Sequence, residues 1–169
     1  MVTLRPTRKL RGALPTTEMA KPSDTALGDW YVNRLVVDRR PLLLLVSSSS
    51  LLPILVPARD VAGLPGRLAD LVASRLVRLG IEASLINAEV NAMRPIMVGA
   101  TIDRSVVGIM VDFAKAVPYY LDAGSWDDAS LAIVEDKLAR TPCRASKPWE
   151  QAVFPDRKAP EVLAAKWAG

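Results

Sequence analysis

Residues 27–58 read LGDWYVNRLVVDRRPLLLLVSSSSLLPILVPA, and this stretch decides the fold. It holds the longest apolar runs in the chain, and turn-forming residues cut it into three pieces of strand length. Apolar runs this continuous are typical of strands whose surfaces are largely covered. The stretch therefore predicts a three-stranded antiparallel meander, with strands over residues 32–37, 42–46 and 51–56 and turns at 38–41 and 47–50.

The remainder of the chain is mostly helical in its hydrophobic spacing. Apolar residues recur every three or four positions over residues 65–79, 82–93, 104–116 and 125–140. A short alternating segment at residues 2–5 predicts a strand that pairs with the edge of the meander, and 96–98 predicts another short strand. Because the main strands precede the helices, we expect an α+β fold, with a small antiparallel sheet covered on one face by a layer of three to four helices.

The length of 169 residues and the 50% hydrophobic content favour one domain over residues 1–169. Residues 12–25 are rich in Pro, Thr, Ala and Ser, which predicts a mobile surface loop. Residues 142–169 contain four prolines, which predicts an extended C-terminal segment that ends in a short helix over 161–167.

Composition excludes several kinds of chemistry. The chain has no histidine, which rules out a Ser-His-Asp triad, a Cys-His dyad and any metal site that needs imidazole. Its one cysteine, Cys143, has no second cysteine for an internal disulfide. We expect no metal and no cofactor. The net charge of +4 suits nucleic acid or an acidic protein as partner, and a solvated basic surface is the plainer interpretation.

The apolar stretch is not expected to cross a membrane. Four serines and Pro53 interrupt it, and its uninterrupted runs are shorter than the roughly 20 residues of a spanning helix. The basic N-terminus is not followed by an apolar region of signal-peptide type. We therefore expect a cytoplasmic protein with no membrane contact.

The start of the first meander strand is a candidate binding site. Trp30 or Tyr31 could stack on a base or anchor a protein interface. On the alternative, structural interpretation, both aromatic rings fill the end of the sheet while Asp29 and Asn33 bond to neighbouring backbone.

The helix over 104–116 supplies the second candidate site. Asp103 is a plausible N-cap for this helix, and Arg104, Ser105 and Asp112 are its candidate binding residues. Ser105 and Asp112 are seven positions apart, which places them on one face. With Lys115 and Tyr119, Arg104 could instead handle phosphate, as in histidine-free ribonuclease toxins.

Several segments together resemble a family of uncharacterised bacterial proteins, defined as a domain of unknown function. The most specific matches are Gly-Asp-Trp-Tyr-x-Asn at 28–33 and Arg-Ser-Val-x-Gly-x-Met-x-Asp-Phe at 104–113. The resemblance extends over residues 2–115 in the same order. It implies no activity, and where relatives tend to have polar residues this chain has Ile109 and Val111. That difference disfavours catalysis.

The sequence thus predicts a non-enzymatic binding protein that acts through a protein partner, a second copy of itself or nucleic acid. A toxin–antitoxin, plasmid or phage-defence module is the expected setting, by analogy with small basic bacterial proteins. The alternative is a ribonuclease-type toxin that uses Arg104, Lys115 and Tyr119. In either case we expect the functional surface where residues 29–33 meet residues 104–112.

Overall fold

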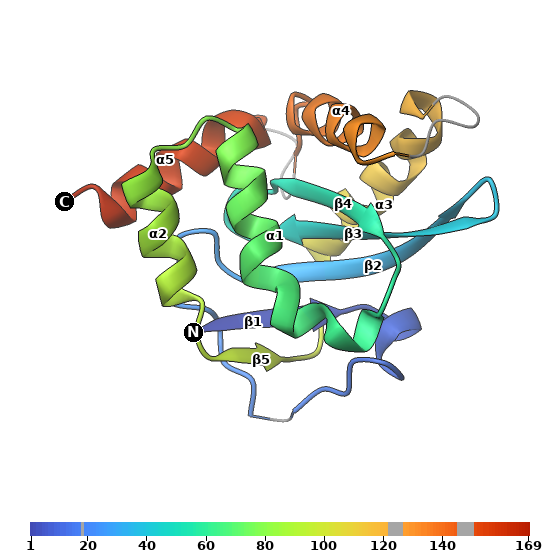
Figure 1. Ribbon diagram of the computed structural model, residues 1–169, viewed down its shortest axis with the longest axis horizontal. Helices are drawn as coiled ribbons and strands as arrows, with labels where there is room; N and C mark the ends of the chain where they lie inside the picture. Colours follow the sequence, from blue (N-terminus) through green and yellow to red (C-terminus); the bar gives the residue numbers. More distant parts are fainter. Residues whose placement is uncertain (18, 122–126, 145–150) are drawn as a thin grey trace.

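The computed structural model describes residues 1–17, 19–121, 127–144 and 151–169, and within them five strands form one mixed sheet (Figure 1). The order across the sheet is β4-β3-β2-β1-β5. The strands are β1 (Val2–Pro6), β2 (Trp30–Val37), β3 (Arg40–Ser47), β4 (Pro53–Pro57) and β5 (Ile96–Val98).

The predicted meander is confirmed as β2, β3 and β4, which pair in antiparallel fashion. The N-terminal strand pairs with the meander as expected: β1 lies beside β2, in parallel, and β5 lies parallel to β1 on its far side. At the turn between β2 and β3, Asp38 and Arg39 have φ angles of 49° and 64°. Positive φ at both central residues is the geometry of a type I′ hairpin turn, whose twist matches that of the strands.

The α+β class is confirmed, and the helices divide between the two faces of the sheet instead of forming one layer. Helices α1 (Leu64–Arg78), α2 (Ala83–Ala92) and α5 (Pro155–Trp167) cover one face. Helices α3 (Arg104–Tyr120) and α4 (Asp128–Ala139) cover the other, where Figure 1 shows α3 behind the sheet. The reason lies in β3, where Leu43 and Leu45 point to the first face and Leu42 and Leu44 to the second. Both faces are therefore apolar and both need cover.

Most helix boundaries follow the predicted signals. Asp103 caps α3 by accepting a hydrogen bond from the Ser105 amide at 2.9 Å, and Asp127 caps α4 by bonding the Ser130 amide at 2.8 Å. The predicted start of α4 at Ser125 lies outside the described residues. Helix α5 begins six residues earlier than the predicted 161, because a proline fits the first turn of a helix, where its missing N–H has no partner to lose.

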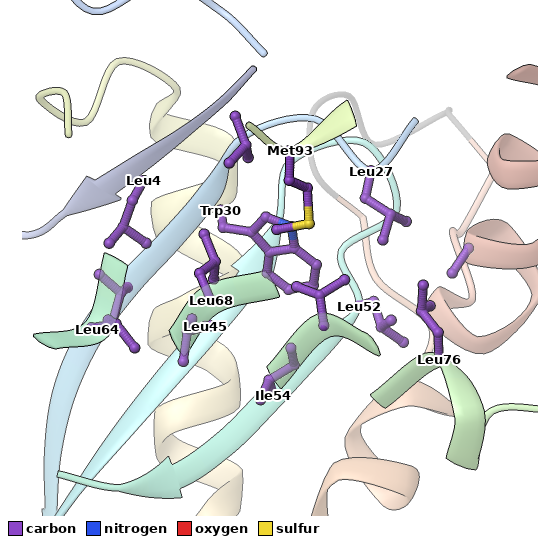
Figure 2. Packing of buried hydrophobic residues seen from close by; sticks show 14 of the residues in the cluster. Leu4, Leu27, Trp30, Leu45, Leu52, Ile54, Leu64, Leu68, Leu76 and Met93 are labelled. Carbon is purple, nitrogen blue, oxygen red and sulfur yellow. The ribbon is translucent and has the colours of Figure 1, made fainter. Parts of the chain in front are cut away.

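The first core is built around Trp30, which is fully buried between the sheet and α1. Figure 2 shows its ring enclosed by leucines from several elements, with the sulfur of Met93 beside it. The loop over 12–25 crosses the β5 side of the sheet, where the Thr17 amide donates to the Val98 carbonyl at 2.9 Å. The mobility predicted for this loop stays a prediction. Among the described helices none combines the length and apolarity needed to span a bilayer.

Candidate functional site

Asp29 is a buried junction between three parts of the chain. Its carboxylate lies 2.5 Å from Nε of Arg5 in β1, and accepts hydrogen bonds from the amide and hydroxyl of Ser23 at 2.9 and 2.6 Å. The same Arg5 donates from Nη1 to the Ala100 carbonyl at 2.7 Å, on the approach to α3. Asp29 therefore joins the 12–25 loop and β1 to the start of β2, and both partners of its ion pair are nearly inaccessible to solvent.

The two aromatic residues that follow are also inside. Trp30 is in the first core, and Tyr31 packs under α3 in the second. The Tyr31 hydroxyl accepts hydrogen bonds from the amides of Asp103 at 2.9 Å and Ile102 at 3.4 Å, and burial raises its pKa. These bonds reach residues 102 and 103, just before the expected segment, and the Tyr31 ring shares a core with Val106 and Ile109 inside it. Neither ring presents a face on which a base could stack.

Asn33 is the first residue of β2 beyond the end of its pairing with β1. Its Oδ1 accepts hydrogen bonds from the Thr7 hydroxyl at 2.7 Å and from the Arg34 amide at 2.9 Å. The Thr7 amide makes the last backbone bond between the two segments, to the Val32 carbonyl at 3.0 Å. Beyond that bond no described strand pairs with β2 on this side, because β1 ends its pairing at the register Pro6 with Val32.

Along β2, the backbone N–H and C=O groups of successive residues point alternately toward β3 and away from it. The register with β3 therefore shows which residues beyond Asn33 direct these groups away from β3. Val32 and Arg34 turn their backbone groups away from β3, and a period of two places Val36 on the same side. Within the described part of the chain no strand pairs with this side of residues 34–37. We call these residues the free edge. Figure 1 shows the β2–β3 hairpin reaching beyond β1 and β4.

A groove of about 510 Å³ follows the free edge, and η1 (Arg8–Leu10) and α3 also contribute to its walls. Val36 is 61% exposed beside it. Pro118 of α3 has no N–H to donate to the Ala114 carbonyl, so a backbone acceptor on this wall lacks its usual helical partner. The groove is lined by Lys9, Arg34, Leu35, Val36, Val37, Ala114 and Pro118. Both charged residues in this lining are cations.

On each of the two outermost strands, a neighbouring segment occupies a backbone carbonyl. On β4, Arg75 Nε donates to the Pro53 carbonyl at 3.2 Å, and α4 packs against the strand. On β5, the Val98 carbonyl accepts a hydrogen bond from the Thr17 amide. Natural sheets protect their edges in such ways because an open edge invites pairing with another chain. On the free edge of β2 the Arg34 amide donates to Asn33 Oδ1, and within the described residues no strand pairs with the next outward residue, Val36.

An ion cluster links α1 to α4 beside the β4 edge. Glu135 lies 3.2 Å from Arg75 Nε and 2.7 Å from Arg78 Nη2, while Asp136 lies 3.2 Å from Arg75 Nη1. Burial raises the pKa of Glu135, against the pull of the two guanidinium groups, and lowers the pKa of Arg75. A cleft of about 380 Å³ adjoins the cluster. The buried Nη2 of Arg75 has no hydrogen-bond partner among the described residues, but its Nε and Nη1 contact the β4 backbone and the two α4 carboxylates. The cluster therefore acts to hold two helices and an edge strand together.

The α3 residues predicted for phosphate handling do not converge. Arg104 and Lys115 are exposed on the outer face of α3, and Tyr119 is 88% exposed further along it. Eleven residues of helix separate the two cations by about 16 Å, which is too far for both to hold one phosphate. The Ser105 hydroxyl donates to the carboxylate of its N-cap, Asp103, at 2.6 Å. Asp112 is exposed and lines a hollow that Leu138 and Cys143 also line.

Sequence reasoning missed the free edge and its groove residues Lys9, Arg34 and Val36. One signal was present, because the strand predicted over 2–5 is shorter than the β2 strand it joins. The register between them decides which end of β2 stays open, and periodicity does not specify register between strands that are distant in sequence.

Comparison with known proteins gives a family and no function. No curated protein and no solved structure matches the chain. The model of the family described as Domain of unknown function (DUF6933) matches residues 3–158. That span includes the free edge, the Asp29 junction and all of α3, and on this evidence the chain belongs to that family of unknown function.

Proposed function

We propose that this protein is a non-enzymatic binding protein, which captures an extended, acidic segment of a partner protein by strand addition at the free edge of β2. The observation that carries the proposal is the edge of β2 at residues 34–37, where no described strand pairs with the outward backbone of Val36. On each outermost strand, by contrast, another segment already occupies a backbone carbonyl. An open edge supplies main-chain donors and acceptors in the pattern that an added strand requires.

The groove determines the chemistry of the incoming segment. Lys9 and Arg34 favour carboxylates on the partner, because opposite charges across an interface guide association and fix register. Val36 and the apolar wall beside α3 favour aliphatic side chains at alternate positions. The best match is therefore an extended segment in which acidic and aliphatic residues alternate.

A protein partner is better supported than nucleic acid. Binding to single strands uses exposed aromatic platforms, and the two aromatic residues at the start of β2 are buried. We place the protein in the bacterial cytoplasm, within a toxin–antitoxin, plasmid or phage-defence module. Copurification from the native host, with identification of the retained protein, tests that setting.

A pair of substitutions at one position tests strand addition. Val36→Pro removes an N–H that points away from β3, so it blocks the added strand and leaves the β2–β3 ladder intact. Val36→Thr keeps the N–H and the β-branched shape and serves as the matched control. The ligand is a synthetic peptide of alternating Glu and Val residues, or the copurified partner, titrated by NMR.

We expect the wild type and Val36→Thr to bind, with the largest amide shifts at residues 34–37. Val36→Pro should lose at least about tenfold in affinity, which corresponds to about 1.4 kcal/mol for the lost main-chain contact. Equal binding by Val36→Pro, or shifts centred on another surface, would refute strand addition at this edge.

A further inference from the structure

The outer face of α3 carries a regular exposed stripe that no described element covers. Arg104, Gly108, Val111 and Lys115 follow one another at spacings of four, three and four residues, which places them on one side of the helix. All four are exposed, and Val111 is 44% exposed. Ile102, just before the helix, is 65% exposed. Aliphatic side chains and charges therefore alternate along a face that turns away from the sheet.

Gly108 has no local reason to be glycine. A Cβ added at this position meets no atom within 4 Å, so no neighbour in the described chain demands a small residue. Glycine in an exposed helix interior weakens the helix relative to alanine. A second backbone that approaches closely at this point would account for the missing side chain.

The charges around Gly108 are self-complementary. Arg104 lies four residues before it and Asp112 four residues after it, and neither forms an ion pair with any described residue. If two α3 helices pack antiparallel about a two-fold axis at Gly108, each residue faces the one equally far on its other side. Arg104 of each copy then faces Asp112 of the other.

We infer that the protein forms a two-fold homodimer through α3, with the helices antiparallel and closest at Gly108. Two Arg104–Asp112 ion pairs flank the axis, and Val111 packs in the centre against the N-terminal turn of the second copy. A single-helix contact is small, so the dimer is weak and depends on concentration. The inference stands apart from strand addition, which uses β2.

Charge reversal tests the inference by sedimentation velocity over about a hundredfold range of concentration. Wild type should shift from monomer to dimer as concentration rises. Asp112→Arg and Arg104→Asp should each remain monomeric, because each places like charges together at both ends of the contact. The double variant Arg104→Asp with Asp112→Arg should regain the dimer, since it restores opposite charges with their positions exchanged.

A wild type that stays monomeric over the whole range would overturn the inference. So would single variants that dimerise like the wild type, or a double variant that stays monomeric while its circular dichroism and melting temperature match the wild type. Gly108→Gln gives an independent check: it should melt at an equal or higher temperature and fail to dimerise. Dimerisation by folded Gly108→Gln would also count against the model.

Discussion

At the scale of single residues, the least replaceable side chain is the buried carboxylate of Glu135. It faces two arginines, and one of them, Arg75, is completely inaccessible to solvent. A buried ion pair adds little when intact, but removal of one member leaves the other charge buried and uncompensated. The β4 edge would lose its cover at the same time.

We expect Glu135→Ala to lower the free energy of unfolding by about 3–5 kcal/mol, measured by urea denaturation. Asp136→Ala is the matched control, because Asp136 contacts the same arginine and its side chain is 45% exposed. Its loss should cost no more than about 1 kcal/mol. Similar losses for the two variants would mean that burial is not what makes Glu135 important.

Cys143 provides a test that depends on pH. Burial, with a smaller contribution from Asp112, raises the pKa of its thiol to about 11. Because the pKa is higher in the folded state, the neutral thiol stabilises the folded protein at pH values below the ordinary thiol pKa. This stabilisation is lost as the pH rises through about 11. At pH 8 the thiolate should be about a hundredfold scarcer than in an unperturbed thiol. Alkylation of the native protein should therefore be slow at pH 8 and accelerate toward pH 11, with the unfolded protein as reference; rapid alkylation at pH 8 would contradict the burial.

At the scale of elements, the β2–β3 turn is strained in a way that a substitution can relieve. Asp38 and Arg39 both have positive φ, which costs an ordinary residue energy and glycine almost none. Arg39 is exposed at the tip of the hairpin. We expect Arg39→Gly to raise the free energy of unfolding by about 0.5–1 kcal/mol, measured by thermal and urea denaturation. Destabilisation would mean that Arg39 makes contacts worth more than the strain.

The elements also show what sequence patterns can and cannot specify. The meander and the cap at Asp103 depend on residues close together in the chain, and they were predicted correctly. The second helical layer was missed because an unbroken leucine run indicates burial without saying how the helices divide between two faces. The roles of Asp29 and Tyr31 depend on Arg5 and on the α3 turn, partners distant in sequence, so the pattern left both interpretations open.

At the scale of the whole molecule, the modest charge of +4 has a measurable consequence. Strand addition relies on main-chain bonds and on two cations of the groove, so added salt should weaken binding to an acidic peptide only moderately. Nucleic-acid binding loses affinity steeply with salt, by a slope that grows with the number of phosphates contacted. A steep dependence for the native partner would favour nucleic acid and contradict the proposed function.

Strand addition requires that the backbone edge of β2 is unpaired beyond the end of β1. Amide hydrogen exchange of the free protein, resolved by NMR at residues 34–37, measures this directly. The N–H groups of Leu35 and Val37 point into the β3 ladder and should exchange slowly, whereas the Val36 N–H should exchange quickly. Protection of Val36 equal to that of its two neighbours would show that the edge is already occupied, and the account of this site would be wrong.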